Sequence, residues 1–160
     1  MKSLCIFMKQ FPKISGKDLE GKEYTLPFDL QGEYNIVIVP FLRHQQIVVN
    51  YWVAYLEELS KKIPIFEFYE IPTLSLGYSA ARFMIDGGMR AGIPDIKTRK
   101  RTITVYINKN RFKKQLGIRT EQYISIFLLK NDEIIWEERG DFTKEKGQSL
   151  ENFLSNLNKK

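Results

Sequence analysis

The segment from Tyr34 to Leu59 constrains the fold more than any other part of the chain. Residues Tyr34–Phe41 form an apolar, β-branched run of strand length. A short polar segment follows, and from Ile47 onward apolar residues recur at the spacing of one helical stripe. The stripe consists of Val48, Tyr51, Trp52, Tyr55, Leu56 and Leu59. We therefore predict a buried strand that leads directly into an amphipathic helix. Residues 43–46 would lie at the carboxyl end of the strand, where open α/β sheets place their binding sites.

A second strand is predicted over Ile63–Tyr69, so the central segment forms a βαβ unit with parallel strands and a right-handed crossover. Pro40 cannot donate a hydrogen bond to a neighbouring strand, and we expect it at the last paired position or at a bulge. The turn-rich segment Phe11–Asp29 contains a short strand in GKEYTL, and its prolines confine it to a sheet edge. We predict one domain over residues 1–160, with a core from about 11 to 157, since domains commonly have roughly 100–200 residues.

Hydrophobic periodicity and turn residues give the remaining elements. We expect residues 4–8 to form either a short strand or a frayed end. We predict a helix over 74–89 that ends at its two glycines, a loop over 91–101 and a strand over 102–107. A basic helix over 109–116, a hairpin of strands 123–129 and 133–139, and a helix over 141–160 complete the chain. The helix over 74–89 would place Leu76, Ala80, Phe83 and Met84 on one face.

The composition restricts the chemistry that is available to the chain. Cys5 is the only cysteine and His44 the only histidine, so we expect no intrachain disulfide, no Cys/His metal site and no cofactor. We expect Cys5 to be a small buried apolar residue. The formal net charge of +6 either favours an anionic partner or simply maintains solubility. With no apolar run near the ~20 residues of a membrane span and no signal-peptide pattern, we expect a cytoplasmic protein.

The order of these elements resembles the thioredoxin-like fold and, within it, the peroxiredoxin-like (alkyl hydroperoxide reductase) branch. FPKISGKDLEGKEYTL is similar to the N-terminal hairpin of that branch, and PFLRHQQ to a strand end that in one subgroup runs Phe-Leu-Arg-His into Cys-x-x-Cys. LGI at 116–118 and ISIFLLKNDEIIWEERG resemble its late helix and hairpin. Trp136 adds a second similarity, to mitochondrial ATP synthase assembly factors with a degenerate thioredoxin-like domain. The resemblance implies an α/β fold with a central mixed sheet, flanking helices and an N-terminal hairpin extension.

The chain departs from this family at the residues that carry its chemistry. Depending on a one-residue shift, the cysteine positions hold Gln46 and Val49 or Ile47 and Asn50. The family's cis-proline position falls near Tyr123 or Ile124, where no proline occurs. Thiol exchange and peroxide reduction both require a thiolate, so the sequence does not favour an enzyme. We predict a redox-inactive protein that binds another protein or a small anion, as an assembly or scaffolding factor. The alternative is an oxidoreductase of the same family with a non-standard site.

Four polar residues remain where the family's redox site would be. Arg43, His44, Gln45 and Gln46 lie at a predicted helix N-terminus, whose free N–H groups attract anions. They form either a site for a carboxylate or phosphate, or a solvated turn. His44 has no evident serine or aspartate partner, so the sequence does not support a hydrolytic triad.

A dense basic cluster provides the second candidate site. It consists of Lys97, Arg99, Lys100 and Arg101, followed further along by Arg111 and neighbouring lysines. With Tyr106 and Phe112 as stacking groups, it would bind nucleic acid. The alternatives are a solvated face or contact with an acidic protein.

Overall fold

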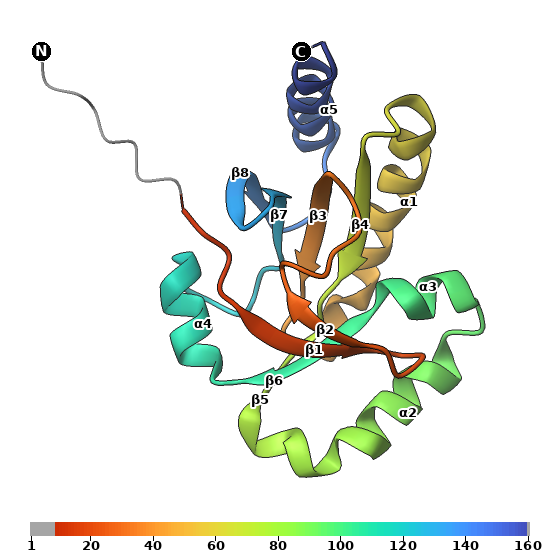
Figure 1. Ribbon diagram of the computed structural model, residues 1–160, viewed down its shortest axis with the longest axis vertical. Helices are drawn as coiled ribbons and strands as arrows, with labels where there is room; N and C mark the ends of the chain where they lie inside the picture. Colours follow the sequence, from red (N-terminus) through yellow and green to blue (C-terminus); the bar gives the residue numbers. More distant parts are fainter. Residues whose placement is uncertain (1–8, 160) are drawn as a thin grey trace, which may run out of the picture.

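The computed structural model describes residues 9–159, and its strands form mixed β-structure flanked by helices (Figure 1). The strands are β1 (Ile14–Asp18), β2 (Glu23–Leu26), β3 (Tyr34–Val39), β4 (Phe66–Glu70), β5 (Thr73–Ser75), β6 (Ile103–Ile107), β7 (Ser125–Lys130) and β8 (Glu133–Arg139). The helices are α1 (Gln46–Lys62), α2 (Arg82–Gly92), α3 (Ile96–Arg101), α4 (Lys109–Leu116) and α5 (Lys144–Asn158), with 3₁₀ turns η1 (Arg43–Gln45) and η2 (Leu76–Ala81).

Strand β3 lies in the middle of the strand order β4-β3-β7-β8. It is parallel to β4 and antiparallel to β7, which confirms the βαβ unit and the late hairpin. Every residue of β3 is buried because both faces of the sheet are covered. Val37 and Val39 belong to one core cluster, and Ile36 and Ile38 belong to the other. A strand buried on both faces requires a continuous apolar run, as the sequence shows at this point.

A second group of strands, in the order β2-β1-β6-β5, is joined to the first through the segment that contains β5. On one side, the N–H groups of Ile71 and Thr73 donate to the carbonyls of Ile38 (2.7 Å) and Pro40 (3.0 Å). On the other side, Glu70 forms a parallel bridge with Thr102. Pro40 follows the last residue of β3, as its missing N–H requires. The predicted N-terminal hairpin is confirmed as β1 and β2, and β2 is an outer strand.

Helix α1 covers one face of the sheet, but its buried stripe differs from the predicted one. Val49, Trp52, Leu56 and Leu59 are buried, whereas Tyr51 is 65% exposed. Of the predicted residues, Trp52, Leu56 and Leu59 are buried, and Val48 and Tyr55 are partly buried against the same core. The prediction was wrong at Tyr51, and it missed Val49. The expectation that Trp52 belongs to the core is confirmed.

The segment from 74 to 101 is folded differently from the prediction. Leu74 pairs with Tyr106 in β5 instead of beginning a helix, and α2 continues through its glycines to Gly92. The predicted loop over 91–101 contains α3, because the Asp95 side chain accepts a hydrogen bond from the Thr98 N–H (2.9 Å) and caps that helix. The predicted face of Leu76, Ala80, Phe83 and Met84 is exposed.

The C-terminal part follows the sequence pattern more closely. Helix α4 has the predicted bounds, and Gly117 follows it with a φ of 67°, the left-handed conformation that ends many helices. Helix α5 begins three residues later than predicted, after the capping residue Thr143. Strand β4 likewise starts late, at Phe66, because α1 extends to Lys62. The predicted segment 4–8, with Cys5, lies outside the described residues.

Candidate functional site at the start of helix α1

The candidate site is the turn between β3 and α1. The chain leaves the sheet at Val39, passes through η1 and enters α1 at Gln46. Three of the four predicted site residues, Arg43, His44 and Gln46, are exposed on this turn. The fourth, Gln45, is only 2% exposed.

Gln45 holds the turn together through all the polar atoms of its side chain. Its Oε1 atom accepts hydrogen bonds from the N–H groups of Phe41 (2.8 Å) and Leu42 (3.0 Å). Its Nε2 atom donates to the carbonyl of Glu121 (2.6 Å), in the segment before β7. The amide is therefore not available to a ligand, and it occupies two N–H groups that would otherwise attract an anion. An anion site here would consist of Arg43, His44 and Gln46.

No thiol is present at the cysteine positions of the turn in either register. Gln46 donates a hydrogen bond from Nε2 to Oδ1 of Asn50 (3.0 Å) on the helix surface. Val49 is completely buried in the core, and Ile47 is 67% exposed. The turn therefore offers amide and apolar side chains to a partner, and no nucleophilic sulfur.

Glu70 is a buried carboxyl that the sequence reading missed. It closes β4 opposite Ile38 of β3, and it is only 5% exposed. Burial raises the pKa of the Glu70 carboxyl, and hydrogen bonding with Gln46 and Thr102 opposes that rise. Gln46 is the first residue of α1, so the carboxyl lies beside the candidate site. The sequence signal was an acidic residue at the end of an apolar strand, directly before Ile71.

We expect Glu70→Gln to stabilise the protein at neutral pH. Because the pKa of Glu70 is raised in the folded state, folding is favoured while the carboxyl is protonated, and this stability is lost as the pH rises through the folded-state pKa. Chemical denaturation at pH 7 should give a higher free energy of unfolding for the variant than for the wild type, and the difference should shrink on acidification. If the difference in free energy of unfolding between variant and wild type stays the same on acidification from pH 7, the raised pKa of Glu70 is contradicted.

Exposed apolar side chains lie on two segments next to the turn. Ile47 and Tyr51 lie one helical turn apart on α1, and Tyr123 is 56% exposed in the segment before β7. These two parts of the chain are fixed to each other, since Trp52 Nε1 donates to the carbonyl of Gly140 (2.9 Å) and a Cβ on Gly140 would lie 3.6 Å from the Tyr123 ring. We refer to Ile47, Tyr51 and Tyr123 as the α1 surface.

The predicted basic cluster does not form one patch. Lys97, Arg99, Lys100 and Arg101 lie on α3, which precedes β6, and Arg111 lies on α4, which follows β6. Figure 1 shows these two helices on opposite sides of the molecule. Two of the arginines support the fold. Arg99 donates to the carbonyl of Ile93 (2.6 Å), and the Arg101 guanidinium lies 4.0 Å from the centre of the Phe68 ring.

The proposed stacking residues are not available to bases. Phe112 is 2% exposed in the core, and Tyr106 is 7% exposed and donates a hydrogen bond to Asp86 (2.7 Å). The expectation that they stack on nucleotides is therefore wrong. Nucleic-acid binding would rest on the exposed charges of α3 or α4 alone, and charge without stacking or base contacts carries no sequence information.

The strand order, the βαβ unit and the flanking helices define a thioredoxin-like α/β fold. The chain is similar to the thioredoxin domain of a thiol-disulfide oxidoreductase from Bacteroides vulgatus, with a TM-score of 0.60, 18% identity, and 93% of this chain and 99% of that chain covered. It is also similar to a thiol:disulfide interchange protein from Bacteroides sp., with a TM-score of 0.57, 20% identity, and 92% of this chain and 90% of that chain covered. A third similar structure is BsSco, a member of the Sco family of cytochrome c oxidase assembly proteins. Its TM-score is 0.53 at 11% identity, with 94% of each chain covered.

These similarities confirm the predicted thioredoxin-like fold class. At 11–20% identity they show the fold and do not assign the chain to the peroxiredoxin branch or to the ATP synthase assembly factors. No protein-family model and no curated protein matches the sequence. Within residues 9–159, no three His, Cys, Asp or Glu side chains are grouped so as to hold a metal ion. None of the helices in this part of the chain has the length and apolar character of a membrane span.

Proposed function

We propose that this protein is a redox-inactive member of the thioredoxin-like superfamily that acts by binding another protein at the α1 surface. The observation that carries the proposal is a turn with no thiol at either pair of cysteine positions, fixed by Gln45, whose side-chain oxygen and nitrogen are both hydrogen-bonded. A turn fixed in this way presents a rigid surface, and rigid surfaces lose less entropy on binding.

The exposed side chains of the α1 surface support protein binding. Ile47, Tyr51 and Tyr123 provide apolar and aromatic contacts, and tyrosine is enriched at protein interfaces. Arg43 and His44 are exposed on the adjoining turn and would contact carboxylates of the partner. The residues of the candidate anion site would then take part in binding the protein. The similarity to BsSco, which is described as belonging to a family of assembly proteins, supports an assembly or scaffolding role.

The proposal predicts that the protein does not catalyse thiol exchange. Insulin reduction and peroxide turnover should not exceed the uncatalysed rates, and Cys5→Ser should have no effect on either. A rate above background that Cys5→Ser abolishes would overturn the redox-inactive assignment.

Affinity purification from the source cells should recover a specific protein with the wild type and lose it with the pair Ile47→Ser and Tyr51→Ser. Recovery of the same proteins with both would contradict binding at the α1 surface.

A further inference from the structure

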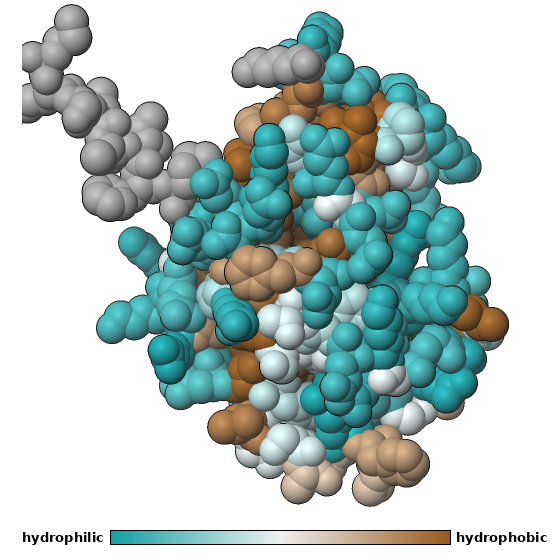
Figure 2. All heavy atoms as spheres, viewed as in Figure 1, coloured by the Kyte–Doolittle hydropathy of each residue, from teal (hydrophilic) through white to brown (hydrophobic). Residues whose placement is uncertain are grey.

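The segment of η2 and α2 exposes four large apolar side chains, and none of its residues is buried. The exposed fractions are 59% for Leu76, 59% for Tyr78, 92% for Phe83 and 78% for Met84. Figure 2 shows apolar atoms along the lower edge of the molecule, where Figure 1 places α2. We refer to these four residues as the α2 surface. An amphipathic helix normally buries its apolar side, so this arrangement is inverted.

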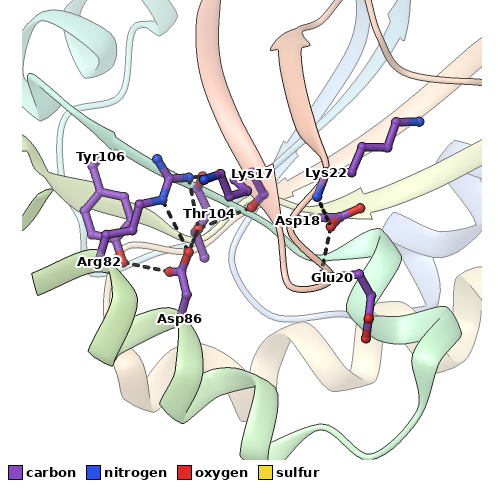
Figure 3. A network of polar contacts seen from close by, with 8 residues as sticks. All are labelled: Lys17, Asp18, Glu20, Lys22, Arg82, Asp86, Thr104 and Tyr106. Atoms are coloured by element: carbon purple, nitrogen blue, oxygen red, sulfur yellow. Dashed lines mark hydrogen bonds and ion pairs between the residues drawn. The ribbon is translucent and has the colours of Figure 1, made fainter.

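The polar side of α2 is the side that binds the rest of the protein (Figure 3). Arg82 donates to the carbonyl of Thr104 (2.9 Å) and lies 4.8 Å from the centre of the Tyr106 ring. Asp86 accepts hydrogen bonds from Thr104 Oγ1 (2.9 Å) and from the Tyr106 hydroxyl (2.7 Å). These contacts fix the rotation of the helix and hold Phe83 and Met84 in solvent.

The same network removes negative charge from the outer side of the segment. Asp86 is the only acidic residue between Leu76 and Gly92, and its carboxylate points toward β6. Asp86 is half-buried and paired with Arg82 and two hydroxyl groups, so the outer side of the segment carries apolar, small and basic side chains. A surface with basic and no acidic side chains attracts anions.

Basic side chains flank the α2 surface. Arg90 near the end of α2, and Lys97 and Lys100 on α3, are all exposed, and Arg90 also lies 3.5 Å from the carboxylate of Glu20. Between Leu76 and Arg101 the sequence contains six basic and two acidic residues. Exposed aromatic and aliphatic residues next to lysine and arginine are typical of helices that lie in the interface of an anionic membrane.

We propose that the α2 surface docks on an anionic lipid bilayer, with Phe83 and Met84 entering the headgroup region and Arg90, Lys97 and Lys100 contacting acidic headgroups. Charge complementarity favours this occupant over a second copy of the chain, which would bring the same basic residues together. Figure 1 shows α2 at the outer edge of the molecule, so a flat bilayer can reach it. This site is separate from the α1 surface and does not depend on the function proposed there.

Co-sedimentation of the full chain with lipid vesicles tests the proposal. We expect retention on vesicles of phosphatidylcholine with phosphatidylglycerol, little retention on phosphatidylcholine alone, and weaker retention at high salt. The pair Phe83→Ser and Met84→Ser should reduce retention by about tenfold or more, because two apolar anchors are removed. Phe28→Ser is the matched control, since Phe28 is 57% exposed in the turn after β2 and its loss should leave retention unchanged.

Three outcomes would overturn the proposal. The first is no retention of the wild type on anionic vesicles. The second is equal retention of the wild type and the variant with both serines, with circular dichroism showing that both are folded. The third is a dimer in analytical ultracentrifugation that the two serines dissociate, which would assign the α2 surface to a second copy.

Discussion

Gln45→Ala should lower the free energy of unfolding by about 3 kcal/mol. The substitution leaves the N–H groups of Phe41 and Leu42 and the carbonyl of Glu121 without their partner. A buried polar group without a partner costs about 1–3 kcal/mol, and partial access of water to the turn reduces the sum for three such groups. Urea denaturation followed by circular dichroism measures this change.

Gln46→Ala is the matched control for this prediction. The residue is chemically identical and adjacent in sequence, but its side chain is exposed and bonds to the side chains of Asn50 and Glu70 instead of to the backbone of the turn. Its replacement should change the free energy of unfolding by less than about 0.5 kcal/mol. Equal losses at the two positions would show that Gln45 does not hold the turn.

Trp52→Ala should have the largest effect of the substitutions considered, a loss of about 3–5 kcal/mol. Trp52 is completely buried, it packs edge-on against Phe142 with ring centres 5.2 Å apart, and its Nε1 atom donates to the carbonyl of Gly140. The substitution therefore creates a cavity and an unpaired carbonyl where α1 meets the segment between β8 and α5. Thermal or urea denaturation measures the loss.

The neighbouring Tyr51→Ala separates stability from binding. Tyr51 is 65% exposed, and we expect its replacement to change the free energy of unfolding by less than about 0.5 kcal/mol. A loss as large as that of Trp52→Ala would mean that Tyr51, and not the observed stripe, faces the sheet.

The elements that the sequence predicted well are those with one dominant signal. Strand β3 shows an uninterrupted apolar run, and helix α4 ends at Gly117, the residue type best suited to its left-handed conformation. The buried stripe of α1 was harder to predict because tyrosine at 51 and valine at 49 are both compatible with an interior position. The contacts with the sheet, which lie far away in sequence, decide between them.

The region around α2 could not be predicted because periodicity does not show which side of a helix faces inward. The spacing correctly indicated an apolar side, and the usual rule assigns that side to the core. Here Arg82 and Asp86 meet hydroxyl groups of Thr104 and Tyr106, about 20 residues away in the chain. Hydrogen bonds over such a separation leave no local signal in the sequence.

At the candidate site, the sequence located the turn but did not show which of its side chains hold the turn together and which are exposed. The glutamines at 45 and 46 are indistinguishable in sequence, and only the approach of the Glu121 carbonyl separates the buried amide from the exposed one. The buried carboxyl of Glu70 was missed for the same reason. Its burial results from α1, β3 and the residue before β6, which meet only in the folded chain.

The position of Arg101 bears on how the protein avoids aggregation. Its guanidinium covers Phe68 at the outer side of β4 and lies 3.8 Å from Glu57 of α1, so α3 shields that strand from a neighbouring molecule. At the opposite side of the sheet, β8 carries Glu133, Glu137 and Glu138, and its pairing with β7 is irregular at Leu128 and Leu129. Charges and irregular pairing disfavour the addition of a foreign strand. An arginine that the sequence suggested for nucleic acid thus helps to keep the sheet from extending between molecules.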